Sequence, residues 1–494
     1  MPKANNGFYH KERNITMIKF NKKELENKIW GCWIGKNIGG TMGAPFEGRR
    51  ELLDIPGYTT PKGQPLPNDD LDLQLVWLRA MEQVGPHMLS SNYLAEYWLT
   101  YISPHWNEYG ISKSNMLNGI MPTLSGELYN DDWKNSNGAW IRSEFWACLT
   151  PGVPNAAIKY AIMDASVDHG LREGTYAEIF TAALESIAFV ETDRRVLIET
   201  ALTYIPEDSR LAQCITFVLD EYDKGTCYRD VRNMLVEMTK DLGWFQAPAN
   251  ISYAVIGLMY GEGDFEKSLI YTINCGDDAD CSAATCGSIL GIMCGADKIP
   301  SDLKDYIGDR IVTLSINGSY IDYIPKTCTD LTTRIMKLIP SVLNAQGVYM
   351  EYTDGETEYD KNVAFSVLNG YSQNIMKRSP YSFEVSNGYH LKAIVEYDKL
   401  PLITPGEEFK FRITYEHRLE QTVHADIVLS LPEGWEAKYQ KNVFLYYHNQ
   451  TFVRTTTCEY TIMVGENVSN RNDITIHVKT PINPMPLYIP ITLL

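Results

Sequence analysis

The sequence of 494 residues predicts an all-helical domain followed by a β-sandwich domain. Three observations lead to this prediction. From residue 18 to about 345, apolar residues recur at helical spacing. From residue 365 to 494, apolar and polar residues alternate as they do in half-buried strands. The acidic stretch 346–364 lies between the two patterns and is expected to be a linker. A chain of this length accommodates more than one folding unit.

The first region divides into segments with apolar residues at i, i+3 and i+4, separated by turn signals such as Pro151-Gly152 and His169-Gly170. The helices expected from this spacing are 23–35, 71–84, 92–102, 155–167, 176–190, 194–201, 209–222, 228–238, 251–261 and 265–273. No stretch here alternates like a strand over any length, so the domain over 18–345 is expected to be all-α.

The last region alternates most clearly at 409–415, 425–431 and 474–478. Gly- and Pro-containing turn signals at 386–388, 404–406 and 432–434 separate these segments at a spacing typical of sandwiches. An immunoglobulin-like accessory domain is therefore expected over residues 365–494.

Composition excludes several classes of function. The 44 Lys and Arg against 62 Asp and Glu give a net charge of −18, which disfavours binding to a phosphate backbone, so no nucleic-acid partner is expected. No apolar run reaches the ~18–20 residues of a membrane span, and the N-terminus lacks the apolar block of a secretory signal. The 10 cysteines show no zinc or disulfide spacing. These features predict a cytoplasmic location with reduced thiols and no membrane partner.

Two short segments concentrate carboxylates directly before apolar stretches: Asn68–Asp72 and Asp277–Asp280. One Asp before a helix is ordinary N-capping, but three within five residues exceed what capping needs. Two like charges ~4 Å apart repel by about 4 kcal/mol at an effective dielectric of 20, so a partly buried set must take up protons or bind a cation. Oxygen ligands favour Mg²⁺, Mn²⁺ or Ca²⁺ over zinc.

A third segment, Gly31–Glu47, reads as a Gly-punctuated helix that ends at Pro45 and a lone carboxylate. It has neither the residues nor the context of a phosphate-binding loop. Taken alone, it indicates close helix packing followed by a surface Glu.

Together and in this order, these segments make the chain resemble the ADP-ribosylglycohydrolase family over about residues 24–340. The matching motifs are Gly43–Glu47 for G-x-P-x-E, Asn68–Asp70 for S/T-D-D, Asn137–Arg142 for N-G-x-x-x-R, Asp168-His169 for a Ser/Thr-His element, and Gly276–Gly287 for G-x-D-x-D-T/C-x-A-A-x-x-G. The resemblance implies an all-α fold with two Mg²⁺ ions at its centre, for which Mn²⁺ can substitute.

Carried over position by position, the resemblance implies six metal ligands: Asn68, Asp69, Asp70, Asp278, Asp280 and Cys281. Two of them depart from the family pattern. Asn68 replaces a Ser or Thr, although its amide oxygen can still bind a hard ion. Cys281 replaces the more common Thr, and a thiol is a poor Mg²⁺ ligand. Asp277, Asp72 or water could fill that position, one metal could bind weakly, or Cys281 could be a buried structural residue.

The resemblance also implies that Glu47 and Asp280 are catalytic, managing the proton of the attacking water, while Glu47 could instead be purely structural. Candidates for binding substrate are Asn137, Gly138, Arg142 and His169. The guanidinium of Arg142 suits a phosphate or sugar but could equally pair with Asp131 or Asp132. His169 could line the pocket or belong to the core.

The function that follows is a Mg²⁺-dependent hydrolase that cleaves an N- or O-glycosidic bond to ADP-ribose, with a metal-activated water attacking the anomeric carbon. Its partner would be an ADP-ribosylated protein or a small-molecule glycoside, and homo-oligomers are compatible with the sequence. Two alternatives remain. The same fold and metals could act on another glycoside or a nucleoside, since Leu431–Trp435 resembles sandwich modules of carbohydrate-active enzymes. The chain could also be non-catalytic, because the fold has been reused as a lens crystallin.

Overall fold

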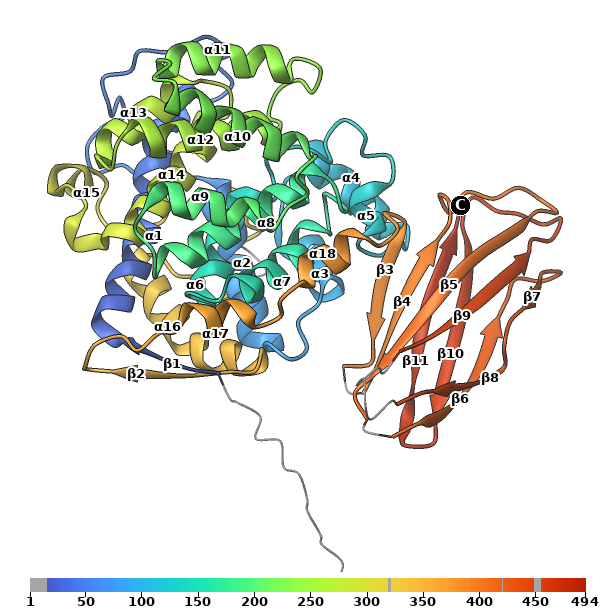
Figure 1. Ribbon diagram of the computed structural model, residues 1–494. Helices are drawn as coiled ribbons and strands as arrows, with labels where there is room; N and C mark the ends of the chain where they lie inside the picture. Colours follow the sequence, from blue (N-terminus) through green and yellow to red (C-terminus); the bar gives the residue numbers. More distant parts are fainter. Residues whose placement is uncertain (1–15, 319–320, 389, 420, 448–454) are drawn as a thin grey trace, which may run out of the picture.

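The computed structural model describes residues 16–494 except 319–320, 389, 420 and 448–454. Within these residues a helical domain lies beside a separate antiparallel sandwich (Figure 1). The prediction of an all-helical domain followed by a β-domain is thus confirmed. The buried apolar side chains form two clusters, one inside the helical domain and one inside the sandwich.

Each of the ten expected helices is present. The first, expected over 23–35, continues to Gly43, and the ends of the others shift by up to four residues. The helices of the first domain are α1 (Lys22–Gly43), α2 (Asp69–Val84), α3 (Ser91–Tyr101), α4 (Asn107–Leu117), α5 (Leu124–Glu127), α6 (Glu144–Leu149), α7 (Pro154–Ala165), α8 (Glu173–Ala188), α9 (Arg194–Leu202), α10 (Arg210–Asp223), α11 (Tyr228–Thr239), α12 (Ala247–Tyr260), α13 (Phe265–Asn274), α14 (Ala279–Cys294), α15 (Ser301–Ile307) and α16 (Cys328–Ala345).

Helices α1 and α14 form the centre of the domain and run antiparallel in backbone contact. Gly31 faces Gly291, Gly35 faces Gly287, and Gly39 faces Ala283. A Cβ atom added at Gly35 would lie 2.1 Å from the carbonyl oxygen of Gly287, so only glycine fits there. This close approach brings the last turn of α1 against the first turn of α14, which carries the second acidic segment.

The segment expected to be a linker, 346–364, is ordered against the helical domain. Strand β2 (Val348–Thr353) pairs in parallel with β1 (Thr16–Asn21), and Val348 and Met350 turn into the helical core. The Tyr359 hydroxyl donates a hydrogen bond of 2.7 Å to the carbonyl of Gly152. Helices α17 (Lys361–Ser366) and α18 (Tyr371–Met376) then lead to the sandwich. The acidic side chains therefore lie on the outer side of a packed segment.

The sandwich consists of a five-stranded sheet in the order β3-β4-β5-β9-β7 and a four-stranded sheet in the order β11-β10-β6-β8. Its strands are β3 (Ser382–Ser386), β4 (Leu391–Tyr397), β5 (Glu408–His417), β6 (Val423–Ser430), β7 (Glu436–Lys438), β8 (Asn442–Leu445), β9 (Thr455–Met463), β10 (Asn472–Thr480) and β11 (Asn483–Leu493). Alternate residues, such as Phe409, Phe411 and Ile413 in β5, are buried between the sheets, as the alternation predicts.

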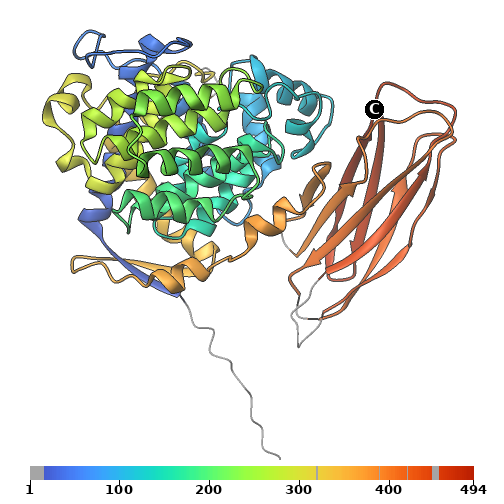
Figure 2. The same ribbon diagram turned by 45° about the horizontal axis from the view of Figure 1, so that its top comes forward.

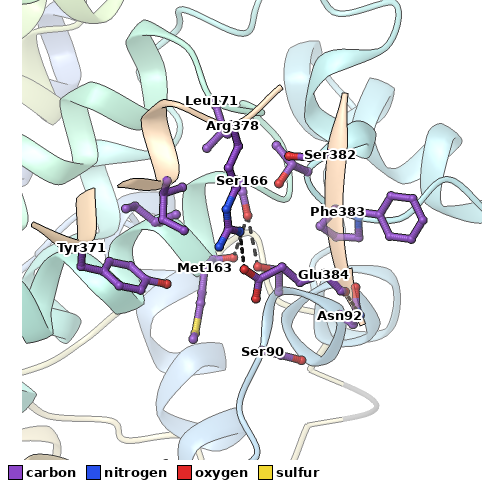
Figure 3. A pocket seen from close by; sticks show the side chains of 15 residues that line it. Ser90, Asn92, Met163, Ser166, Leu171, Tyr371, Arg378, Ser382, Phe383 and Glu384 are labelled. Atoms are coloured by element: carbon purple, nitrogen blue, oxygen red, sulfur yellow. Dashed lines mark hydrogen bonds and ion pairs between the residues drawn. The ribbon is translucent and has the colours of Figure 1, made fainter. Parts of the chain in front are cut away.

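Contacts near α5 and α18 join the two domains (Figure 2). Ile120, Leu124 and Leu128 belong to the helical domain but are buried in the apolar cluster of the sandwich. Beside α18, Arg378 pairs with Glu384 at the edge of a small cavity of about 60 Å³ (Figure 3). The Asn92 side chain donates a hydrogen bond of 3.0 Å to the backbone carbonyl of Glu384. The sandwich is therefore packed against the helical domain near α4, which contributes to the site described next.

Candidate metal centre

The site forms where the ends of three segments meet: the loop after α1, the start of α2 and the start of α14. Backbone hydrogen bonds tie the first of these to the last. Gly48 donates to the carbonyl of Asp277 over 2.8 Å, and Asp277 donates to that of Arg49 over 2.7 Å. Glu47 is thereby held beside Asp278 and Asp280 although more than two hundred residues separate them in the chain.

Asp277 shapes this loop. Its backbone has φ of 62°, a left-handed conformation that few side chains adopt. One carboxylate oxygen accepts a hydrogen bond of 3.1 Å from the backbone of Phe245, and the other accepts one of 3.2 Å from Asn250. The same Asn250 accepts a hydrogen bond from the backbone of Asp278 over 3.1 Å. Both oxygens of Asp277 are therefore engaged in holding the loop.

Two overlapping groups of side chains bring potential ligand atoms within 4.8 Å of one another. The inner group is Asp70, Asp280 and Cys281, all buried, and the outer group is the exposed Glu47 with Asp278 and Asp280. Asp280 belongs to both. One oxygen each of Asp70, Asp278 and Asp280 is buried without a hydrogen-bond partner. Buried carboxylate oxygens are rarely left unpaired, so this donor set fits bound divalent cations.

The crowding of carboxylates raises their pKa values. Repulsion by Asp280, then burial and Asp69, raises the pKa of Glu47 to about 7. Burial and then Asp280 raise that of Asp69 to about 6. Burial also raises the pKa values of Asp70, Asp278 and Asp280. A cation between these groups would stabilise their charged forms and reverse the shifts.

Asn68, Asp72 and Cys281 have the following contacts. The Asn68 side-chain oxygen caps α2 by accepting a hydrogen bond of 2.8 Å from the backbone of Asp70. One oxygen of Asp72 accepts hydrogen bonds of 2.6 Å from the backbones of Leu314 and Ser315, so this oxygen is used on the far side of α2. The Cys281 thiol donates to Asp70 over 3.2 Å, and burial together with Asp278 and Asp70 raises its pKa.

A buried lysine lies behind Asp70. The Lys36 ammonium donates hydrogen bonds of 2.8 Å to a Glu144 oxygen and to the backbone carbonyl of Ile141, and it lies 3.8 Å from Asp70. Burial lowers the pKa of Lys36, but Glu144 and Asp70 outweigh burial, so the net pKa is raised. This residue was not among those expected from the sequence. The signal that could have found it is a single Lys within the Gly-rich stretch Gly31–Gly43 of α1.

Asn137 and Gly138, two of the expected substrate-binding residues, lie beside the acidic cluster. Asn137 donates a hydrogen bond of 2.7 Å to Asp278 and accepts one of 3.1 Å from the indole of Trp140. Both residues line a cavity of about 320 Å³ that opens over the carboxylates. Asn137 thus orients Asp278 at the cavity wall.

Arg142 and His169 are buried behind that wall and are not among the residues that line it. The Arg142 guanidinium donates to Asp164 over 2.8 Å, to Asp168 over 2.7 Å, and to the backbone carbonyl of Gly138. His169 contacts Ser136 over 3.0 Å through Nε2, and its Nδ1 lies 3.0 Å from Asp168. The partners of Arg142 are therefore Asp164 and Asp168, whereas the nearby Asp131 pairs with Lys134.

The cavity is acidic and aromatic. Its lining residues are Glu47, Asp69, Trp106, Asn107, Glu108, Tyr109, Trp133, Ser136, Asn137, Gly138, Ile141, Phe245, Asp278, Asp280 and Cys281. Five of these 15 carry carboxylates, and none is Lys or Arg. The group from Trp106 to Tyr109 was missed by the sequence analysis, because nothing in α4 alone shows that it faces the acidic segments.

Comparison with known proteins now assigns the domain. Residues 21–333, more than half of the chain, match the family model described as ADP-ribosylglycohydrolase. The chain belongs to the ADP-ribosylglycohydrolase family. This family domain indicates a glycosidic-bond hydrolase. Members of the family are in general metal-dependent.

An uncharacterized protein of Archaeoglobus fulgidus is 24% identical over 334 residues, which is 64% of this chain and 100% of that protein. The family match ends before the sandwich begins. In the described residues, no helix combines the length and the apolar character that crossing a bilayer requires.

Proposed function

We propose that this protein is a divalent-cation-dependent hydrolase that cleaves an N- or O-glycosidic bond to ADP-ribose. The observation that carries the proposal is that the inner and outer groups of potential ligands share Asp280 beneath the 320 Å³ cavity. Both groups lie inside a domain of this family. Asp70, Asp278, Asp280 and Glu47 offer oxygens that suit Mg²⁺ or Mn²⁺. A cation held there lowers the pKa of a bound water and stabilises negative charge.

The side chains have separate tasks in this proposal. Glu47 lies at the exposed edge of the site, where its carboxylate would accept a proton from the attacking water. Asp280 belongs to both the inner and the outer group, so it would contribute an oxygen to a cation in either. Asn137 fixes one oxygen of Asp278, while the other is buried without a hydrogen-bond partner and would be available to a cation.

The rim of the cavity supports an ADP-ribose substrate. Trp106 is half-exposed at the rim and Phe245 lies in the lining, so both present rings on which a base can stack. Arg49 and Arg50 follow Glu47 in the chain, and the Arg50 guanidinium lies 3.4 Å over the ring of Trp244. A guanidinium suits a diphosphate, although neither arginine lines the cavity itself.

One observation favours a second candidate. The cavity lining holds five carboxylates and no cation, which disfavours a diphosphate inside it. A glycoside or nucleoside without phosphate would bind in this cavity without that repulsion. The chemistry at the anomeric carbon would be the same.

A substrate screen tests both candidates. The protein is incubated with ADP-ribosylated peptides, nucleosides and aryl glycosides, with Mg²⁺, with Mn²⁺ and with EDTA. We expect cation-dependent release of ADP-ribose. Turnover of unphosphorylated substrates alone would favour the second candidate. Turnover that persists in EDTA would contradict both candidates, and no turnover on any substrate would favour a non-catalytic protein.

Variants of two neighbouring glutamates sharpen the screen. Glu47→Gln should lower kcat by about 10²–10⁴-fold, the usual contribution of a general base. Glu51→Gln is the matched control, because Glu51 is exposed, lies four residues away and pairs with Arg49. Equal activity of both variants would remove Glu47 from the mechanism.

A further inference from the structure

We infer that the metal centre is chemically asymmetric: Asp70, Asp280 and Cys281 form a mixed sulfur–oxygen site for a borderline cation such as Zn²⁺, while Glu47, Asp278 and Asp280 form an all-oxygen site for Mg²⁺ or Mn²⁺. The inference deepens the proposed function, on which it rests for the role of the site. It departs from a pair of identical hard ions.

The geometry of the inner group carries the inference. The Cys281 sulfur lies 3.2 Å from a carboxylate oxygen of Asp70, and the ligand atoms of Asp70, Asp280 and Cys281 all lie within 4.8 Å of one another. Three such atoms can surround one ion. The second oxygen of Asp70, which lies 3.8 Å from the Lys36 ammonium, and one oxygen of Asp280 are buried without a hydrogen-bond partner, so ligand capacity remains.

The burial of these side chains matches a built site. Asp70 is fully buried, Asp280 is 6% exposed and Cys281 is 7% exposed. Asp280 and Cys281 also line the cavity, so an ion held by the inner group has one side open to water or substrate. Three protein ligands and one open position are the arrangement of catalytic zinc sites.

The donor chemistry separates the two groups. Mg²⁺ prefers hard oxygen ligands and near-octahedral geometry, whereas sulfur favours Zn²⁺, Co²⁺ or Cd²⁺. When such an ion binds, the S–H bond of Cys281 breaks, the proton passes to solvent, and a metal–sulfur bond forms. The outer group has no sulfur ligand, so it has no corresponding preference for Zn²⁺, Co²⁺ or Cd²⁺.

Lys36 leaves room for the inner ion. Its ammonium lies 3.8 Å from Asp70 but 2.8 Å from Glu144, so its closer partner is Glu144. Glu144 is held in turn by Gln74 over 2.8 Å and Ser288 over 3.1 Å. Asp70 therefore retains a charge that a divalent cation can balance.

A cobalt titration tests the inference. The metal-free full-length protein, reduced with a phosphine, is titrated with Co²⁺ while the near-ultraviolet absorbance is recorded. A bond between Co²⁺ and a thiolate gives a charge-transfer band there, and oxygen ligands alone do not. We expect the band in the wild type, its loss on adding Zn²⁺, and its persistence in excess Mg²⁺.

Two cysteine variants identify the sulfur. In Cys281→Ser the band should vanish and Zn²⁺ affinity should fall at least about 100-fold, beyond the effect of losing an outer-shell partner. Cys227→Ser is the control and should keep the band, because Cys227 is exposed and its neighbour Asp230 makes it the obvious adventitious site. An unchanged Mn²⁺ affinity of Cys281→Ser would show that this variant is folded.

The outcomes are separable from those of the substrate screen. No band in the wild type, or a band that survives in Cys281→Ser, overturns the inference even if Mg²⁺ supports hydrolysis. A Cys281-dependent band in a protein that hydrolyses none of the substrates supports the inference and contradicts the proposed function.

Discussion

Asp280 is the residue on which both carboxylate groups depend. It shares ligand distance with Asp70 on one side and with Glu47 and Asp278 on the other. In the metal-free protein its charge is repelled by these neighbours, which also raises their pKa values. In the proposed function, Asp280 is retained to bind cations, at a cost to the stability of the empty fold.

Asp280→Asn tests this directly. The substitution removes a charge without changing shape, so Mg²⁺ affinity should fall at least about tenfold. The melting temperature of the metal-free protein should hold or rise, because like charges are separated. Calorimetric titration and thermal unfolding measure the two effects. Asp131→Asn, an exposed carboxylate paired with Lys134, is the control, and unchanged Mg²⁺ affinity of Asp280→Asn would support a mere helix cap.

The raised pKa values predict how stability depends on pH. Acids whose folded-state pKa exceeds the unfolded value stabilise the fold below about pH 4, and this contribution is lost as pH rises through the folded pKa. For Asp69 and Glu47 the folded values are about 6 and about 7. The melting temperature of the metal-free wild type should therefore fall more steeply between about pH 4 and 7 than that of Asp280→Asn. Parallel curves for the two proteins would contradict this.

The spacing of residues along the chain predicted the acidic cluster, but it could not predict which side chains surround the cluster in the fold. Asp278 and Asp280 are only two residues apart, so the concentration of carboxylates is visible in the sequence itself. Arg142 has its partners 22 and 26 residues away on other segments, so its burial and pairing depend on the tertiary fold. The burial and pairing of Lys36 also depend on the tertiary fold, since its partner Glu144 lies 108 residues away in the chain.

Helices α1 and α14 set the position of the metal centre by backbone contact. Gly35→Ala would force a Cβ atom to 2.1 Å from the Gly287 carbonyl, and neither helix has a flexible side chain there that could yield. We expect a loss of at least about 1–3 kcal/mol in unfolding free energy together with weaker Mg²⁺ binding. Chemical denaturation and calorimetric titration measure both. Gly355→Ala is the control, since its Cβ would meet only Thr353 at 3.4 Å. Equal stability of the two variants would mean that the helices can separate freely.

Most helices with clear amphipathic spacing could be predicted from sequence, and the ten expected helices are all present. Helix α16 was not among them, although its buried residues also recur at helical spacing. The β1–β2 pair could not be predicted, because its strands are short and separated by more than three hundred residues, so neither has a partner nearby in the chain. The same holds for the pairing of α1 with α14. Their small residues indicated close packing, but not which helix would be the partner.

The sandwich is joined to the helical domain by residues that follow α4 in the chain, and α4 contributes to the cavity lining. Ile120, Leu124 and Leu128 lie between α4 and the sandwich sheets, and α4 carries Glu108 and Tyr109 of the cavity lining. Every candidate metal ligand nevertheless lies in the helical domain.

Two truncations distinguish the contribution of the sandwich to metal binding from the contribution of the β1–β2 pair to stability. A chain ending at Lys377 keeps β2, α17 and α18, so it should remain helical by circular dichroism and bind Mg²⁺. A chain ending at Leu343 keeps the same carboxylates but loses β2, which exposes Ile18 and Phe20 of β1, and should melt at a lower temperature. Loss of Mg²⁺ binding in the folded Lys377 chain would place part of the centre under the control of the sandwich. Equal melting temperatures would make the β1–β2 pair dispensable.

The backbone contact between α1 and α14 also has a consequence in time. During synthesis α1 leaves the ribosome about 250 residues before α14 is complete, which at the usual rate is a delay of roughly 10–50 s. Throughout that interval its glycine face, which no large side chain shields, has no native partner. The nascent chain must therefore keep its first helix unpaired until most of the domain has been made, and cofactor loading can begin only after that.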